Sequence, residues 1–239
     1  MSGSAVNYTD LVNTISNLTV IQSTDPNFVQ IFPQAISYAE DRLYRELDLL
    51  STVTRDSAAL TVSNRNFTLP SNNGRFVVTN GFNVITPATT TVPDNGTRTQ
   101  LVPVSRDFLD SVWGSVTNAG QPVYYAPITD QQFIVGPWPD AGYTIECIGV
   151  IQPAPLSATN TTTFLSLYLS DLLVAAVMIF MVGYQRDFGS QSDDPTQAQS
   201  WSSQYDKLFA SANIVEMRKK YSSGGWGSLS PTPIATPSR

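Results

Sequence analysis

The chain has 239 residues, a formal net charge of −6 and no histidine, a length at which one large domain or two small ones can bury a core. The acidic balance excludes tight nucleic-acid binding, which depends on clustered Lys and Arg side chains that neutralise phosphates. Without histidine, and with Cys147 as the one cysteine, the sequence excludes His-dependent nucleophilic catalysis and ordinary zinc sites.

The first predicted element is a helix over residues 7–19. Its apolar side chains recur at helical spacing and form one stripe, composed of Tyr8, Leu11, Val12, Ile15 and Leu18. The N-terminal residues have neither the basic nor the hydrophobic region of a signal peptide, so we expect none.

A second helix is expected to start at Pro33. Asp25 and Pro26 have the residue types of an N-cap and a first helical position, but Pro33 follows soon after and favours a break. We therefore predict that the helix starts afresh at Pro33. Its apolar stripe comprises Phe32, Ile36, Ala39, Leu43, Leu47 and Leu50.

Four charged residues lie outside this apolar stripe. Asp41 and Arg45 are four residues apart, as are Arg42 and Glu46, so opposite charges can pair on the helix surface. One interpretation is a solvated helix face. The other is that the four charges fix the register against a neighbouring copy of the chain, because adjoining faces of identical subunits need complementary charge.

Residues 51–155 consist of short β-prone runs separated by turn residues. Hairpins are predicted around Asn64 and Arg65, around Asn80 and Gly81, which suit a type I′ turn, and between YYAPI and QFIVG. The run RDFLDSVW predicts a short helix, and the alternation in YTIECIGVI indicates a half-buried strand. Six or seven such strands imply a small antiparallel sandwich or barrel.

Helical signals return at Thr163. Residues 172–183 are apolar and uncharged, but they fall short of the ~20 residues that span a bilayer. We therefore predict a buried helix at the centre of a bundle. Asp194 and Pro195 begin another helix, whose stripe comprises Ala198, Trp201, Tyr205, Leu208, Ala212 and Val215.

The predicted fold class is α+β. Residues 1–50 and 156–221 are expected to form a helical bundle, and residues 51–155 an inserted antiparallel β sandwich or barrel. Residues 222–239 combine prolines with Ser and Thr and have too few apolar residues to build a core. This composition predicts a flexible C-terminal tail.

The remaining candidates for acid–base chemistry are the carboxylates of the β region. A glycosidase needs two carboxylates that face one cleft, and Asp130, Asp140 and Glu146 are the candidates. Asp130 and Asp140 lie in predicted turns, where Asp stabilises the backbone, and Glu146 lies on a strand, where we expect it to face water. Cys147 is expected to be a small buried residue.

Aromatic residues are the other candidates for a binding surface in this region. An exposed row of them could bind sugar or a partner protein, but we favour packing within a small β core. The residues concerned are Trp113, Tyr124, Tyr125, Trp138 and Tyr143.

The order of these segments resembles that of the head-to-tail adaptor proteins of short-tailed bacteriophages, of the type named after phage SU10. The matching segments cover nearly the whole chain and read YTDLVNTI, DPNFVQIFPQAISYAEDRLYREL, PVYYAPITDQQFIVGPWPDAGYTIE, LYLSDLLVAAVMIFMVGYQRDF and WSSQYDKLFASAN.

The resemblance implies a structural protein without enzymatic activity or cofactor. It implies a dodecameric ring under the portal that connects capsid to tail, made in the host cytoplasm and placed at the head–tail junction of the virion. The partners are then the portal protein, tail or nozzle proteins and neighbouring copies, with no membrane, and DNA passes through the ring without specific binding. The C-terminal tail would grip the portal through Trp226, Leu229, Pro231 and Ile234.

The competing hypothesis is a carboxylate-dependent glycan hydrolase or a sugar-binding tail component. It depends on the three carboxylates of the β region facing one cleft, or on an exposed row of the aromatic residues. The two hypotheses therefore differ in what they require of residues 51–155.

Overall fold

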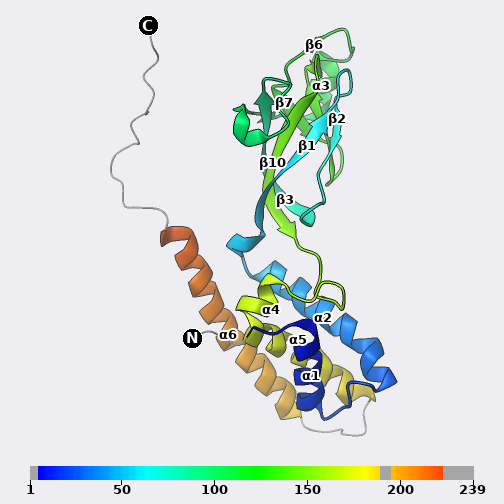
Figure 1. Cartoon of the computed structure of the whole chain (residues 1–239), viewed down its shortest axis with the longest axis vertical. Helices are drawn as coiled ribbons and strands as arrows, with labels where there is room; N and C mark the ends of the chain where they lie inside the picture. Colours follow the sequence, from blue (N-terminus) through cyan, green and yellow to red (C-terminus); the bar gives the residue numbers. More distant parts are fainter. Residues whose placement is uncertain (1–4, 189–194, 223–239) are drawn as a thin grey trace. The chain divides into compact units, whose positions relative to one another are not determined.

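The computed structural model describes residues 5–188 and 195–222 (Figure 1). The chain divides into two compact units, a helical unit of residues 1–50 and 156–239 and a β unit of residues 51–155. Helices and antiparallel sheets confirm the predicted α+β class. Each unit has its own hydrophobic core.

The helical unit begins with the predicted N-terminal helix, and its described elements surround one apolar core. Its helices are α1 (Tyr8–Thr19), α2 (Pro26–Glu46), α4 (Phe164–Tyr168), α5 (Ser170–Phe188) and α6 (Pro195–Ser222). The Asn7 side chain caps α1 by accepting a hydrogen bond from the backbone N–H of Asp10 at 2.9 Å. This cap satisfies one of the free N–H groups at the helix start.

The predicted break at Pro33 is wrong, because α2 continues through this residue from Pro26 to Glu46. Asp25 caps the start by accepting hydrogen bonds from the N–H groups of Asn27 and Phe28. Pro33 removes one helical hydrogen bond, but Phe28, Phe32 and the residues that follow on the same face are buried in one core. Burial of this continuous apolar face outweighs the lost bond.

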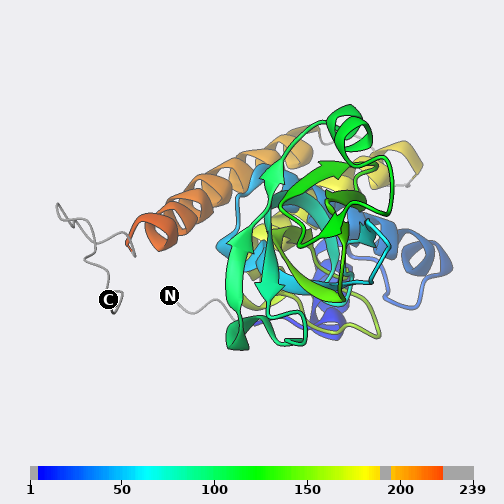
Figure 2. The same cartoon turned by 90° about the horizontal axis from the view of Figure 1, so that it is seen from above.

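Helix α5 is the predicted buried helix of residues 172–183. It packs against α1, α2, α4 and α6. Within residues 172–183, the side chains are buried except for partial exposure at Val174, Ile179 and Phe180, and Gly183 is exposed. Across the described part of the chain, no helix is both long and apolar enough to cross a membrane. Figures 1 and 2 show α6 as one unbroken helix.

Three described residues of the predicted helical stripes are exposed instead of buried. Leu18 of α1 is 44% exposed. Leu50 is 44% exposed, because α2 ends at Glu46 and the helical period no longer applies beyond it. Val215 is 43% exposed, whereas Glu216 is buried. The core-facing stripe of α6 therefore continues from Ala212 by a step of four residues instead of three.

The β unit contains two four-stranded sheets and one short two-stranded sheet. The first sheet has the order β1 (Val53–Leu60), β10 (Tyr143–Gln152), β3 (Arg75–Thr86) and β4 (Thr97–Gln100). The second has the order β2 (Asn66–Thr68), β8 (Gln132–Gly136), β7 (Tyr124–Pro127) and β5 (Val102–Pro103). The remaining elements are β6 (Ala119–Gly120), β9 (Trp138–Pro139), α3 (Arg106–Val112), and the 3-10 helices η1 (Leu50–Thr52) and η2 (Pro93–Asn95).

One of the three predicted hairpins is confirmed. Strands β7 and β8 pair antiparallel, and α3 matches the predicted short helix. The chain does turn at Asn64, whose N–H donates to the carbonyl of Thr61, but β1 pairs with β10 and β2 pairs with β8. The strands on either side of this turn therefore belong to different sheets.

The predicted turn at Asn80 and Gly81 is an irregularity within the continuous strand β3. Gly81 pairs with Ile148 and Thr79 pairs with Gly149, which leaves Asn80 as an extra residue, the arrangement of a β-bulge. Both halves of β3 find their partner in the long strand β10, so no reversal is needed. Gly149 allows this close approach, because a Cβ there would lie 2.2 Å from the Val78 carbonyl oxygen.

The two four-stranded sheets share one core, as in a sandwich. Phe82 of β3 lies 4.8 Å from Phe133 of β8 and 5.2 Å from Phe67 of β2, measured between ring centroids. Both sheets have open edges within the described residues, so the barrel alternative is not formed. The pairings β5–β7 and β6–β9 are parallel, which differs from the wholly antiparallel arrangement predicted.

Candidate functional site

The charged face of α2 brings Arg42 and Glu46 together within one chain. The Nε atom of Arg42 lies 2.9 Å from Oε1 of Glu46, and the Arg42 guanidinium lies 4.1 Å from the ring centroid of Tyr205 on α6. The Tyr205 hydroxyl donates a hydrogen bond to Glu46. These three side chains connect α2 to α6.

The environment of Glu46 favours its charged form. Partial burial acts to raise its pKa, but the hydrogen bonds from Tyr205 and Arg42 hold the pKa of Glu46 below its usual value. Burial and the hydrogen bond to Glu46 raise the pKa of Tyr205, so its hydroxyl remains a donor. The contact is thus an ionic pair held by a neutral phenol.

Asp41 and Arg45 lie on the exposed side of α2. The Arg45 Nε atom donates to the backbone carbonyl of Asp41 at 2.9 Å, a bond within one helical turn. Of the four charged residues predicted on this face, Arg42 and Glu46 thus contact another helix of the same chain, whereas the hydrogen bond of Arg45 to Asp41 lies within α2.

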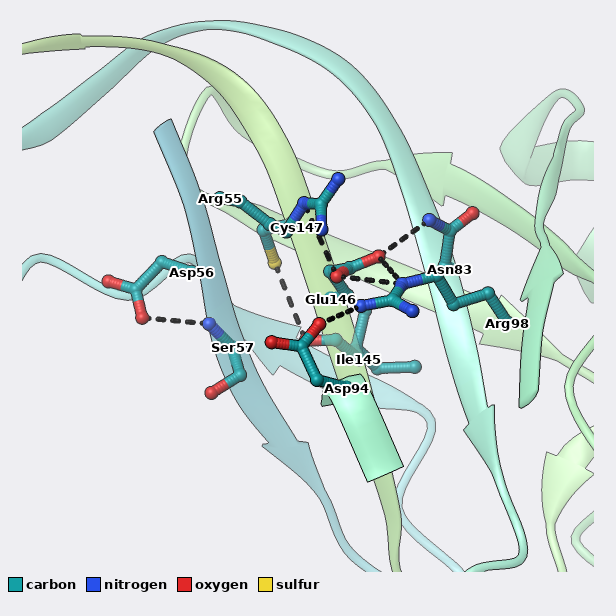
Figure 3. Close-up of polar contacts among 9 residues, drawn as sticks. All are labelled: Arg55, Asp56, Ser57, Asn83, Asp94, Arg98, Ile145, Glu146 and Cys147. Carbon is teal, nitrogen blue, oxygen red and sulfur yellow. Dashed lines mark hydrogen bonds and ion pairs between the residues drawn. The ribbon is translucent and has the colours of Figure 1, made fainter. Parts of the chain in front are cut away.

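Glu146 does not face water as expected. Its side chain is fully buried on the first sheet, where neighbouring strands surround it with polar groups (Figure 3). Arg98 of β4 places Nε 3.1 Å from both carboxylate oxygens, Asn83 of β3 donates at 2.8 Å, and Arg55 of β1 lies 3.5 Å away. Arg98 also pairs with Asp94. Glu146 is therefore the centre of a charged network that joins four strands.

The three candidate carboxylates do not share a cleft. Asp130 pairs with Arg75 at 2.6 Å, and Arg75 is the β-partner of Gln152, six residues along β10 from Glu146, or about 20 Å at the strand rise. A glycosidase pair requires carboxyl groups within roughly 5–9.5 Å. The hydrogen bond from Arg75 also lowers the pKa of Asp130, which is the opposite of what a general acid requires.

Asp140 is engaged by Tyr143. The Tyr143 hydroxyl donates to Oδ1 of Asp140 at 2.7 Å, and burial followed by this bond raises the pKa of Tyr143 to about 12. Tyr143 belongs to the sandwich core, whereas Glu146, three residues on, points to the opposite face of the sheet. Among Asp130, Asp140 and Glu146, the geometry therefore places neither Asp130 nor Asp140 beside Glu146 as a glycosidase pair.

The aromatic residues pack as a core, in agreement with the interpretation that we favour. Tyr125 and Tyr143 contact the sandwich core, and the rings of Trp113 and Tyr124 stack with centroids 5.4 Å apart. Trp138 donates its indole N–H to the carbonyl of Trp113 at 2.7 Å. The aromatic rings thus pack mainly against one another and against the core, and they do not form an exposed row on which a sugar ring could stack.

Cys147 is the small buried residue that the sequence predicts. It is fully buried, and burial, with the nearby Asp56 charge, raises the pKa of its thiol to about 12, which makes it unreactive. In the described portion of the chain, no group of three or more Cys, Asp or Glu residues could hold a metal ion. The tail residues Trp226, Leu229, Pro231 and Ile234 lie outside the described residues.

Sequence reasoning missed two buried glutamates in the helical unit, Glu40 and Glu216, each 2% exposed. Glu40 accepts the N–H of Leu156, and Glu216 accepts the N–H of Leu50. Glu40 lies next to the apolar positions Ala39 and Leu43, and Glu216 lies four residues after Ala212. The spacing of Glu40 and Glu216 from these apolar residues places both on the core-facing side of their helices, and this was the sequence signal that could have identified them as buried.

Comparison with known proteins identifies one family. The sequence model of the SU10 adaptor protein family matches residues 6–228, which span both units. None of the curated proteins matches the chain. The match agrees with the resemblance seen in the sequence and, because it covers nearly the whole chain, shows that the protein belongs to the SU10 adaptor protein family.

Proposed function

We propose that this protein is a structural adaptor at the head–tail junction of a short-tailed bacteriophage virion. In this role, copies of the chain form a ring under the portal and connect the capsid to the tail. The observation that carries the proposal is the family match over residues 6–228, because it includes the helical unit and the β unit together. We also propose that the ring has twelve copies, the number that the family resemblance implies.

The charges of the β unit support a conduit that does not retain DNA. This unit has five arginines and no lysine, and each arginine forms an ion pair with a carboxylate. The pairs are Arg55–Glu146, Arg65–Asp110, Arg75–Asp130, Arg98–Asp94 and Arg106–Asp110. Arginines already neutralised in this way bind phosphates weakly. The net charge of −6 further disfavours contact with DNA.

The proposed partners are the portal protein, the tail or nozzle proteins and neighbouring copies of the chain. We assign portal contact to the C-terminal tail, with Trp226, Leu229, Pro231 and Ile234 as anchors between Pro, Gly and Ser residues. Isolated apolar anchors in an extended segment can fill small pockets along a groove. Repetition around a ring compensates the entropy cost of ordering each copy of the tail.

The proposal is tested by mixing the purified protein with portal particles and recording electron micrographs. We expect added density with a central hole on one face of the portal, and no such density with portal and an unrelated acidic protein. Sedimentation of the free protein measures whether the ring needs the portal as a template. Portal particles that remain unchanged at high protein concentration contradict the proposal.

A DNA-binding measurement tests the conduit role separately. A gel shift at physiological salt should show no complex with double-stranded DNA, because free basic side chains are scarce in the described β unit. Tight binding that weakens steeply with salt would contradict the assignment of a passive channel, since such a slope reports neutralised phosphates.

A further inference from the structure

The chain passes between its two units at two places, and both have the same feature on the helical side. The boundaries lie after Leu50 and before Leu156. At each boundary, the helical-unit residue donates its backbone N–H to a buried glutamate: Leu50 to Glu216 at 3.1 Å, and Leu156 to Glu40 at 3.1 and 3.2 Å. The two glutamates belong to different helices, α6 and α2.

The C-terminal turns of α6 hold the first of these connections. Besides the bond between Glu216 and Leu50, the ammonium group of Lys220 forms an ion pair with Asp48. Lys219 pairs with Glu216 and lies 5.2 Å from the ring centroid of Phe164. Two contacts thus fasten residues 48–50 to the end of α6, and Lys219 joins the same end of α6 to α4.

Helix α2 holds the second connection. Both carboxylate oxygens of Glu40 accept the N–H of Leu156, and Thr163, which caps α4, contacts the same carboxylate at 3.5 Å. Leu156 is itself buried in the core of the helical unit, as is Leu49 beside the first connection. Each connection is therefore fixed by an apolar anchor together with a carboxylate.

Burying these two carboxylates costs desolvation free energy, which indicates that they have a role beyond packing. A glutamate buried in an apolar core must be removed from water, and a well-packed apolar residue of similar volume is often at least as stable. A backbone N–H that is buried outside a helix or strand, however, needs an acceptor. Residues 153–157 have no regular secondary structure, so Leu156 has no ladder partner within that segment.

We propose that Glu40 and Glu216 form a two-point clamp that fixes the segments leading into and out of the β unit to α2 and α6. The clamp makes the backbone at residues 48–50 and at residue 156 part of the helical unit. Because Glu216 lies near the end of α6, a displacement of that helix end moves residues 48–50 with it. A link from portal contact to this displacement rests on the proposed function, whereas the clamp itself does not.

Amide hydrogen exchange on the full-length free protein tests the clamp. In the wild type, the N–H groups of Leu50 and Leu156 should be protected, although Leu156 lies outside any helix or strand. Glu216→Leu should accelerate exchange at Leu50 by about 10- to 100-fold, as expected for loss of a hydrogen bond to a charged acceptor. Glu40→Leu should do the same at Leu156 when exchange is measured at pH 8, where Glu40 is charged. Rapid exchange at both amides in the wild type would overturn the proposal without any variant.

The two variants control for each other. Glu216→Leu should leave Leu156 unchanged, and Glu40→Leu should leave Leu50 unchanged, because each glutamate holds one connection. Glu40→Gln and Glu216→Gln retain a carbonyl acceptor and should leave protection within about threefold of wild type. If a Leu variant fails to fold, these Gln variants and the wild-type protection still decide the question. Equal acceleration at both amides in either Leu variant would show general loosening and contradict separate anchor points.

Limited proteolysis distinguishes a clamp from two local hydrogen bonds. Chymotrypsin cleaves after Leu, so opening of the clamp should expose Leu49, Leu50 or Leu156 to cleavage and yield fragments that separate residues 51–155 from the rest. We expect cleavage there to rise about tenfold in the Leu variants, in proportion to the population of the open segment. Unchanged cleavage despite accelerated exchange would show that the glutamates do not hold the connections.

Discussion

Glu40 is a carboxyl group whose protonation is coupled to folding. Burial raises its pKa to about 7, against the lowering effect of the hydrogen bonds from Leu156 and Thr163 and with a smaller raising effect from Asp41. The folded state therefore holds this proton at pH values where the unfolded chain, with a pKa of 4.5, has lost it. The stabilising contribution is fully present below pH 4.5 and is lost as the pH rises through about 7.

We predict that Glu40→Gln flattens the pH dependence of stability. In the wild type, this carboxyl should lower the free energy of unfolding by up to roughly 3 kcal/mol between pH 4.5 and pH 8. Urea denaturation of both proteins at pH 5, 6.5 and 8 measures the difference, which should grow in favour of the Gln variant as the pH rises. A difference that is constant across this range would contradict the assignment to Glu40.

At the level of elements, the buried face of α2 and its C-cap residue Leu47 stabilise the helical unit. Leu43 is fully buried and Leu47 is 3% exposed. We predict that Leu→Ala at either position lowers the free energy of unfolding by about 2–5 kcal/mol, because it removes buried methyl groups and leaves a cavity. Leu18→Ala is the control, since Leu18 is 44% exposed and should change stability by less than about 0.5 kcal/mol. Wild-type melting of both α2 variants would refute the core assignment.

The charged face of α2 gives a prediction that separates folding from assembly. Arg42 contacts Glu46 and Tyr205 within the chain, so Arg42→Glu should lower the free energy of unfolding by roughly 1–2 kcal/mol. Arg45 contacts its own helix, so Arg45→Glu should leave the melting temperature of the free subunit nearly unchanged.

The same variants test the proposed contact between copies. Arg45→Glu should weaken ring formation on portal particles, because reversal of charge at a contact between subunits is repulsive. Asp41→Lys tests the other member of the exposed pair in the same way. If both variants assemble as the wild type does, the charges of α2 act within one chain or face solvent.

For the whole molecule, the residues after α6 carry the assigned contact with the portal. We predict that deletion of residues 223–239 leaves the fold of both units intact, because their composition, with three prolines among Ser and Thr and few apolar residues, cannot build a core. Circular dichroism and melting should match those of the full chain, whereas recruitment to portal particles should be lost or strongly weakened.

Point variants test which residues of the tail contribute to recruitment by portal particles. Trp226→Ala and Ile234→Ala should each reduce recruitment, because an aromatic or aliphatic anchor contributes most of the affinity of an extended segment, whereas Ser228→Ala should not. Normal recruitment of the truncated protein would assign portal contact to another part of the chain. Such a result would leave the clamp at Glu40 and Glu216 unaffected, since that inference is tested on the free subunit.

What the sequence determined by itself is the set of local patterns and their order. Periodicity identified α1, the buried α5, the stripe of α2 and the hairpin of β7 and β8, because apolar spacing reflects which face of an element is buried. Asp25 has the residue type of an N-cap, and its side chain does cap α2, although the sequence pattern predicts that this helix starts afresh at Pro33. The order of these segments also indicated the family that the match over residues 6–228 then showed.

The tertiary structure alone decided which partner each segment finds. Pro33 stays within α2 because burial of a continuous apolar face in the core stabilises the unbroken helix. Asn80 forms a bulge instead of a turn because β10 pairs with both halves of β3. Glu146, Glu40 and Glu216 are buried because arginines of neighbouring strands or backbone N–H groups distant in sequence complete their hydrogen bonds. A local sequence pattern indicates which secondary structure a segment favours. Burial of a charged side chain depends instead on hydrogen-bond partners that come near only in the folded chain.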